Sequence, residues 1–185
     1  TKSGMTYTLP QETLCHKRLM KNYQTFYRRI TKPFVQHPWL IRSLRWLNGA
    51  IVVGMYVSYI LLLLWVALFA GGINELLPLV FIPGVGFVLL SLIRHHLNYS
   101  RPYEEWPIKP LIPRKGSGDS LPSRHVFSAT VIAMSVMSVS RVLGLILLAL
   151  ALILAMVRVI GGIHYPRDVI AGFFCGLACG IVLVI

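Results

Sequence analysis

Three short polar clusters interrupt otherwise apolar sequence, and their residue types are those that bind and cleave a phosphate ester. The first cluster contains Arg94 and Arg101, the second is the segment 122–125, and the third is the segment 158–168. Arg, His and Asp at the ends of membrane-length apolar runs are costly, so they indicate a functional site. Cationic donors, a candidate nucleophile and a candidate proton donor are all present, as phosphoryl transfer requires.

Among the candidate catalytic residues, His164 and Asp168 are the pair that most specifically indicates catalysis. A carboxylate beside an imidazole fixes the tautomer of the ring and leaves its other nitrogen able to attack an electrophile. At the start of a helix, the same two residues can instead cap the helix and form a hydrogen bond at the protein surface. The nearby Arg158 and the more distant His125 favour the catalytic interpretation.

Ser123 stands where a helix is expected to begin, and its hydroxyl can either cap that helix or bond a phosphoryl oxygen. Free backbone N–H groups and the helix dipole attract an anion there. His125 lies just behind and can protonate a departing alkoxide. Arg94, Arg101 and Arg158 can each clamp phosphoryl oxygens through paired donors, although an interfacial arginine that holds headgroups is the alternative for each.

The composition places these clusters in a membrane protein. Hydrophobic residues make up 56% of the 185 residues and charged ones 13%, with a mean hydropathy of +0.69. These values exclude an ordinary soluble domain. The net charge of +12 fits anionic headgroups or phosphorylated substrates as partners, and the long apolar runs argue against nucleic acid. The three cysteines have no zinc-site spacing, so no metal site is predicted.

The predicted fold is an all-α integral membrane protein with about five transmembrane helices in a bundle, preceded by basic amphipathic interfacial helices. The expected apolar runs are residues 50–70, 76–93, 125–140, 142–157 and 166–185. Pro78 and Pro83 are expected to bend or delay the second run. Short turns make successive runs alternate in direction, so the three polar clusters are expected on one side of the membrane.

In this interpretation the chain consists of three segments. Residues 1–4, before Met5, resemble a cloning remnant. Residues 5–48 are predicted to form the basic amphipathic helices, which either bind anionic headgroups or pack on the protein's own surface. Residues 49–185 are predicted to form the membrane-embedded domain, with residues 95–122 as its catalytic loop.

The clusters resemble the three-part motif of the type 2 phosphatidic acid phosphatase (PAP2) and vanadium haloperoxidase superfamily, in its membrane lipid phosphatase branch. That motif reads K-x-x-x-x-x-x-R-P, then P-S-G-H, then S-R-x-x-x-x-x-H-x-x-x-D. This chain has R-H-H-L-N-Y-S-R-P at 94–102, P-S-R-H at 122–125 and V-R-V-I-G-G-I-H-Y-P-R-D at 157–168. The resemblance covers residues 94–168 and, through the layout of the spans, residues 50–185.

The resemblance implies that His164 is the nucleophile and forms a phosphohistidine that water later hydrolyses. Asp168 would orient this ring, and His125 would be the general acid for the leaving group. The phosphate would be held by Arg94, Arg101, Ser123, Arg158 and the backbone at Arg124. The family's phosphatases need no metal or other cofactor. The chain departs from the motif where Arg94 replaces Lys, Arg124 replaces Gly and Val157 replaces Ser, and in having five expected spans where many members have six.

The function implied is hydrolysis of a phosphomonoester or diphosphate of a lipid, such as undecaprenyl diphosphate, phosphatidylglycerophosphate or phosphatidate. The alternatives are a non-catalytic lipid-binding or scaffold protein that retains the phosphatase fold, a vanadate-dependent oxidant and a transporter.

The side of the membrane on which the site lies is open to two interpretations. Of the 18 Lys and Arg residues, 17 fall on the catalytic side, since only Arg141 is expected on the other. The positive-inside rule then favours a cytoplasmic site, which would suit phosphatidylglycerophosphate or phosphatidate. The family's lipid phosphatases usually work on the outer face, which would suit undecaprenyl diphosphate.

Overall fold

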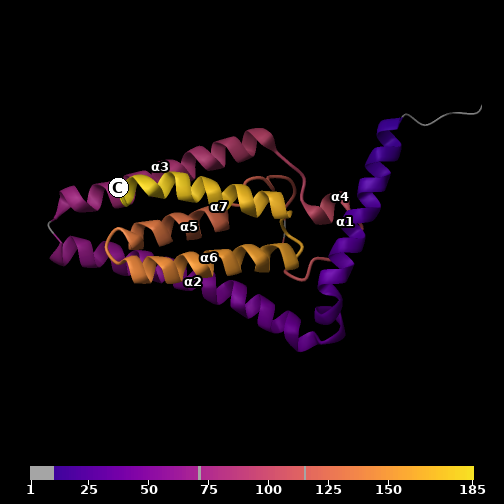
Figure 1. Cartoon of the computed structure of the whole chain (residues 1–185), viewed down its shortest axis with the longest axis horizontal. Coiled ribbons are helices and arrows are strands. Elements are labelled where there is room, and N and C mark those ends of the chain that lie inside the picture. Colours follow the sequence, from indigo (N-terminus) through magenta and orange to yellow (C-terminus); the bar gives the residue numbers. More distant parts are fainter. Residues whose placement is uncertain (1–10, 71, 115) are drawn as a thin grey trace, which may run out of the picture.

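The computed structural model describes residues 11–70, 72–114 and 116–185, and all regular structure within them is helical. The elements are α1 (Gln11–Gln36), α2 (Pro38–Phe69), α3 (Ile73–Leu97), α4 (Pro102–Glu105), α5 (Arg124–Met137), α6 (Arg141–Ile160), α7 (Pro166–Gly180) and a final 3-10 helix, η1 (Ile181–Leu183). Figure 1 shows α2, α3, α5, α6 and α7 running side by side, with α1 crossing one end of this bundle. The residues expected to be a cloning remnant, 1–4, lie outside the described residues.

The protein is an all-α, multi-pass membrane protein, as the sequence predicted. Four stretches of the described residues are long and apolar enough to cross a membrane: Pro38–Phe69, Ile73–Glu105, Arg141–Ile160 and Pro166–Leu183. The fifth apolar helix, α5, has 14 residues and is about 21 Å long, which is shorter than a bilayer core of roughly 30 Å.

Helix α5 lies in the middle of the bundle, so its length need not match the bilayer (Figure 1). Ten of its 14 residues are buried. Its buried hydroxyls bond to its own backbone: Thr130 Oγ1 donates to the Val126 carbonyl at 2.9 Å and Ser135 Oγ to the Val131 carbonyl at 3.0 Å. A helix that satisfies its polar groups internally can occupy an interior without water. α5 therefore forms the core against which the lipid-facing helices pack.

A row of glycines on α7 lets this helix approach α5 closely. A Cβ atom added at Gly172 would lie 2.6 Å from the carbonyl oxygen of Ser123, and one at Gly176 would lie 2.6 Å from Cβ of Thr130. Small residues at this spacing bring two helix backbones together in membranes. The Ser123 N–H also donates to the Asp168 carbonyl at 2.9 Å. The starts of α5 and α7, which carry predicted site residues, are thereby fixed beside each other.

Helix α3 continues through Pro78 and Pro83 instead of being delayed by them. Proline at position 83 has no N–H for the carbonyl of Leu79, four residues earlier. The hydroxyl of Tyr59 on α2 donates to that carbonyl at 2.7 Å. A neighbouring helix thus supplies the donor that the proline removes, which is how transmembrane helices tolerate proline.

Helix α2 begins at Pro38, well before the apolar run that starts near Ala50. Proline suits a first helical turn because its missing N–H would have no partner inside the helix. The early turns of α2 join the bundle through Leu44, which clusters with Leu111 and Val157. His37 is the residue that separates the end of α1 from the start of α2.

Helix α1 has one side against the protein and one side exposed. Tyr27 and Thr31 are buried, whereas Arg28, Arg29 and Lys32 are exposed. Packing of one helix face on the protein's own surface, one of the two expected arrangements, is thus present, and the basic side remains accessible. In Figure 1 this helix lies at the end of the bundle where α3 and α6 finish and α5 and α7 begin.

Candidate active site

The structure brings the eight predicted site residues to the end of the bundle that α1 crosses (Figure 1). Their positions are the last turn of α3 (Arg94), the start of α4 (Arg101), the start of α5 (Ser123, Arg124, His125), the last turn of α6 (Arg158), the α6–α7 loop (His164) and the first turn of α7 (Asp168). All are buried except Arg124 and His125, which are partly buried. Helix ends and loops from five elements therefore build the site.

The imidazole of His164 faces the carboxylate of Asp168. Nδ1 lies 3.5 Å from Asp168 Oδ2, and both side chains are 1% exposed or less. Burial lowers the pKa of His164 from 6.5 to about 4, although its hydrogen bond to Asp168 opposes this change. The ring is therefore neutral near neutral pH, with a nitrogen lone pair available for attack. Because Nδ1 is directed at the carboxylate, Nε2 is the nitrogen placed to react.

Asp168 is held by two donors besides His164. Its Oδ2 accepts a hydrogen bond from the hydroxyl of Ser120 and another from the Tyr165 N–H at 3.0 Å. Ser120 is fully buried and was not predicted. It lies 48 residues from Asp168 in the sequence, outside the motif, so only tertiary structure reveals the contact. These bonds fix the carboxylate that orients the candidate nucleophile.

Arg101 uses its guanidinium to join the nucleophile loop to the segment before α5. Nη1 donates to the Ile163 carbonyl at 3.0 Å, Nε to the Gly118 carbonyl at 2.9 Å and Nη2 to the Asp119 carbonyl at 3.0 Å. Arginine has five N–H donors, so two remain for an anion. The residue expected only as a phosphate clamp is thus also a positioning residue for the backbone next to His164.

Arg94, Arg158 and Ser123 retain buried donors without partners. Arg94 donates from Nη1 to the Pro122 carbonyl at 3.0 Å, but its Nε has no partner. Nε of Arg158 and Oγ of Ser123 also have none, and the Ser123 side chain does not cap α5. Each such buried group costs about 1–3 kcal/mol. The cost is offset where an anion supplies acceptors to all of them at once.

The cations of the site have no carboxylate that neutralises them. Among the residues that the structure describes, the ion pairs are His95–Asp119, His164–Asp168 and Arg167–Asp168. None of the site arginines 94, 101, 124 and 158 takes part in one. The same part of the chain contains no group of three or more His, Cys, Asp or Glu arranged to hold a metal ion. The chemistry of the donors fits an anionic ligand.

His125 lines a narrow hollow together with residues of α2, α5 and α6. Tyr56, Ser128 and Ile132 line this hollow and also line a larger apolar groove, of about 380 Å³, between α2, α3 and α5. The shared residues show that the two depressions are adjacent.

Aromatic residues of α1 hold the loop that carries His164. The hydroxyl of Tyr27 lies directly against Gly162, whose φ of +74° favours glycine, so that a Cβ there would collide with it. The ring of Tyr23 packs on that of Tyr165 with centroids 4.9 Å apart. Backbone next to the candidate nucleophile is therefore supported from outside the bundle.

Tyr165 also bonds to the segment that follows Arg101. Its hydroxyl donates to Glu105 Oε2 at 2.6 Å and accepts from Trp106 Nε1 at 2.6 Å. Burial raises the pKa of Tyr165, and the Glu105 carboxylate raises it further, so the hydroxyl stays protonated and can donate. Trp106 and Glu105 lie outside the three motif segments, and neither was predicted to be a site residue.

The fold and the site define a class of membrane enzymes, and comparison with known proteins identifies it. Residues 75–185, more than half of the chain, match the family model described as the PAP2 superfamily, so the chain belongs to that superfamily. The resemblance predicted from the three motif segments is thereby confirmed. No curated protein sequence matches the chain.

Two solved structures share the fold over most of their length. One is the crystal structure of Aquifex aeolicus LpxE, which is 24% identical with a TM-score of 0.66, and the match covers 87% of this chain and 93% of that one. The other is the crystal structure of the first transmembrane PAP2 type phosphatidylglycerolphosphate phosphatase from Bacillus subtilis. It is 20% identical with a TM-score of 0.65, and the match covers 88% of this chain and 84% of that one.

Proposed function

We propose that the protein is a membrane lipid phosphatase that transfers the terminal phosphate of a lipid phosphomonoester or diphosphate to His164 and then to water. The observation that carries this proposal is the group of buried, unpartnered donors around a neutral imidazole that faces a carboxylate. Membership of the PAP2 superfamily supports it.

In the first step, Nε2 of His164 attacks phosphorus. Asp168 stabilises the positive charge that develops on the ring. Arg94, Arg158 and the Ser123 hydroxyl bind the phosphoryl oxygens, together with the free backbone N–H groups at the start of α5. The guanidiniums supply the positive charge that a metal ion supplies in other phosphatases, and we therefore propose that no metal is required.

His125 acts on the leaving group. It lies between the cationic site and the apolar groove, where the ester oxygen of a bound lipid would be placed. Burial, and after it the charge of Arg158, lowers the pKa of His125 to about 3, so the ring takes up its proton only when the negative charge of a bound phosphate raises that pKa again. The protonated ring then protonates the leaving oxygen as the P–O bond breaks, and the neutral ring takes a proton from the water that hydrolyses the phosphohistidine.

A lipid substrate is supported by the position of the site at the ends of membrane spans and by the apolar groove next to the hollow that His125 lines. One solved structure with this fold is that of a phosphatidylglycerolphosphate phosphatase. Phosphatidylglycerophosphate, phosphatidate and undecaprenyl diphosphate are the candidate substrates.

We further propose that the site faces the cytoplasm. The exposed basic residues Arg28, Arg29 and Lys32 of α1 are placed to bind anionic headgroups at the catalytic end, and Arg141 begins α6 at the other end. Labelling of a single-cysteine variant at Ser117, in the catalytic loop, tests this with an impermeant thiol reagent on intact cells, after Cys15, Cys175 and Cys179 are replaced. Labelling only after permeabilisation is expected, and labelling of intact cells would reverse the assignment.

The direct test is phosphate release by the purified protein in detergent with a chelator present. The panel contains phosphatidate, phosphatidylglycerophosphate and undecaprenyl diphosphate. We expect release from at least one lipid and a loss of roughly 10⁴-fold or more in His164→Ala. His37→Ala, an exposed histidine at the start of α2, is the matched control and should retain full activity. A divalent-metal requirement would contradict the metal-free mechanism, and equal turnover by His164→Ala would remove the nucleophile.

A further inference from the structure

Glu104 lies two residues after the first motif segment, and its carboxylate joins two separate parts of the predicted catalytic loop. Oε2 accepts a hydrogen bond from the Arg101 N–H at 3.1 Å, across the first turn of α4. The Gly118 N–H donates to Oε1 at 2.9 Å and to Oε2 at 3.0 Å. One carboxylate therefore bridges the turn that begins at Arg101 and a residue 14 positions further along the chain.

Gly118, which Glu104 holds by its N–H, is held by its carbonyl as well. That carbonyl accepts a hydrogen bond from Arg101 Nε at 2.9 Å, so both polar backbone groups of Gly118 bond to the same turn. The φ of Gly118 is +65°, which favours glycine, and a Cβ there would collide with the side chain of Asn98. The backbone of Gly118 therefore lies closely packed against the turn that carries Glu104.

Two residues after Gly118, the same segment reaches the candidate catalytic pair. The Ser120 N–H donates to the Tyr99 carbonyl at 2.8 Å, and the buried Ser120 hydroxyl donates to Asp168 Oδ2. That oxygen of Asp168 is the one that faces Nδ1 of His164. A shift of the Gly118 backbone is therefore transmitted over two residues to the hydroxyl that holds the Asp168 carboxylate.

The reach of the Glu104 side chain, more than its charge, makes this bridge. Glu104 is exposed, so water and salt screen its charge. Its three hydrogen bonds depend on distance, and they weaken when a donor and its acceptor separate. Oε2 alone lies within 3.1 Å of the nitrogens of both Arg101 and Gly118. A single oxygen at this position is therefore enough to connect the two parts of the loop.

We propose that Glu104 is a positioning residue: it holds the segment 118–120 in place, so that the Ser120 hydroxyl bonds Asp168 and keeps that carboxylate directed at His164. This role rests on the proposed function and adds a residue on which the same site depends. The carboxylate of Glu104 bonds to the loop backbone and not to the catalytic pair, so its effect on turnover passes through Ser120.

The test compares two variants with opposite defects, on whichever of phosphatidate, phosphatidylglycerophosphate and undecaprenyl diphosphate the wild type hydrolyses fastest. Glu104→Gln keeps the reach and one acceptor oxygen but loses the charge, so kcat should stay within about twofold of wild type. Glu104→Asp keeps the charge but is one methylene shorter, so the bridge breaks and kcat should fall about five- to 20-fold. KM should change by less than about threefold in both, because Arg94 and Arg158 are held on α3 and α6.

A double-mutant cycle tests the route through Ser120. Once Ser120→Ala has removed the hydroxyl, adding Glu104→Asp should lower kcat by less than about a further twofold. Ser135→Ala removes an equally buried hydroxyl, which bonds the Val131 carbonyl within α5, and its combination with Glu104→Asp should show the full loss of Glu104→Asp. Glu75→Gln and Glu75→Asp alter an exposed acid in the first turn of α3 and should change neither kcat nor KM.

Three results would overturn this role: a lower kcat in Glu104→Gln than in Glu104→Asp, wild-type kcat in both, or multiplied losses in the cycle with Ser120→Ala. Thermal midpoints are measured beside kcat, so that instability alone does not count as support. If Glu104→Asp does not fold, hydrogen exchange in the wild type decides: the Gly118 amide should be protected, and exchange at the rate of an unstructured amide would overturn the role. Failure of the proposed function differs, because wild type then releases phosphate from none of the lipids while that amide stays protected.

Discussion

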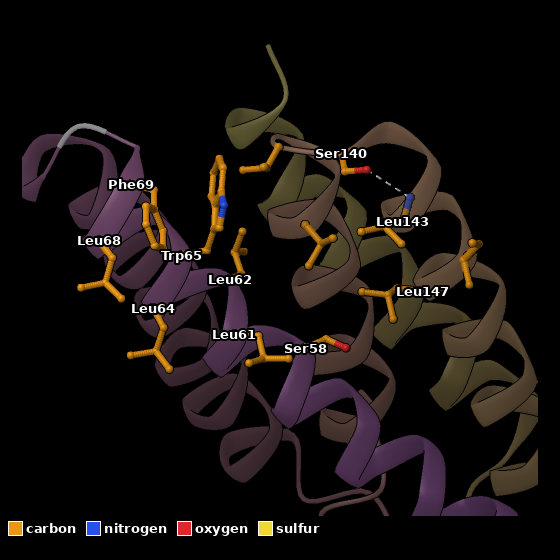
Figure 2. Close-up of a pocket in the computed structure, with 13 residues that line it drawn as sticks. Ser58, Leu61, Leu62, Leu64, Trp65, Leu68, Phe69, Ser140, Leu143 and Leu147 are labelled. Carbon is orange, nitrogen blue, oxygen red and sulfur yellow. Dashed lines mark hydrogen bonds between the residues drawn. The ribbon is translucent and has the colours of Figure 1, made fainter.

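The hollow at the end of the bundle away from the site and the narrow hollow that His125 lines have different linings. The larger, of about 590 Å³, lies between α2 and α6 at the end away from the site (Figure 2). The hydroxyl groups in its lining are those of Ser58 and Ser140, and both already have partners: Ser58 donates to the Gly54 carbonyl at 2.8 Å, and Ser140 accepts from the Leu143 N–H. The catalytic end offers less space, but several of its buried polar atoms have no partner.

The difference shows which property marks a site in a membrane protein. Lipid tails are as apolar as leucine, so an apolar hollow that faces the bilayer can be filled by acyl chains at little cost. A buried guanidinium or imidazole without a partner is expensive wherever it lies. Unpaired polar atoms, rather than volume, are therefore the feature on which we base the proposed reactive end of this protein.

The largest effect is expected from Asp168→Asn, which removes the carboxylate from the reactive end. By analogy with other His–Asp pairs, kcat should fall by roughly 10³- to 10⁴-fold. Glu75→Gln, an exposed acid at the other end, is the matched control and should have no effect.

The same variant gives a pH test with a defined sign. In wild type, kcat/KM should fall as the pH drops through about 4, where His164 becomes protonated and loses its nucleophilic lone pair. The Asp168 hydrogen bond raises the pKa of His164, so its removal should move this acid limb to lower pH. An acid limb that moves to higher pH would contradict the assigned pairing.

An intermediate effect is expected from Gly172→Ala, which tests how the fold brings the reactive groups together. The added Cβ would lie 2.6 Å from the Ser123 carbonyl oxygen, so the starts of α5 and α7 must separate. We expect a stability loss of about 1–3 kcal/mol, seen as a lower thermal midpoint, and a reduced kcat. Gly54→Ala adds the same atom where nothing lies within 4 Å. Equal behaviour of the two variants would show that the close approach is not needed.

Much of the fold could be predicted from the sequence, and so could the position of the motif residues at one end of the bundle. The apolar runs gave the membrane bundle, and the alternation of their directions placed Arg94, His125 and His164 at one end. The contacts that complete the site could not be predicted. Ser120 reaches Asp168 and Glu105 reaches Tyr165 across 48 and 60 residues, and no local pattern encodes either contact. The same holds for Tyr59, whose hydroxyl lets α3 continue through Pro83.

The smallest effect is expected from Leu143→Trp in the larger hollow of Figure 2. The substitution fills apolar space that lipid would otherwise fill, so kcat/KM should stay within about twofold of wild type. A loss comparable to that of Asp168→Asn would show that the two ends of the bundle are coupled and that the larger hollow is needed for turnover.

The central claim is that His164 becomes phosphorylated, and an alkaline rapid-quench experiment tests it most directly. Wild-type protein is mixed with a lipid phosphate labelled in its terminal phosphate, stopped in base, which preserves phosphohistidine, and mapped by mass spectrometry. We predict label on His164 in wild type and none in His164→Ala. Phosphate on another residue, or turnover in which no phosphorylated protein forms, would contradict the mechanism.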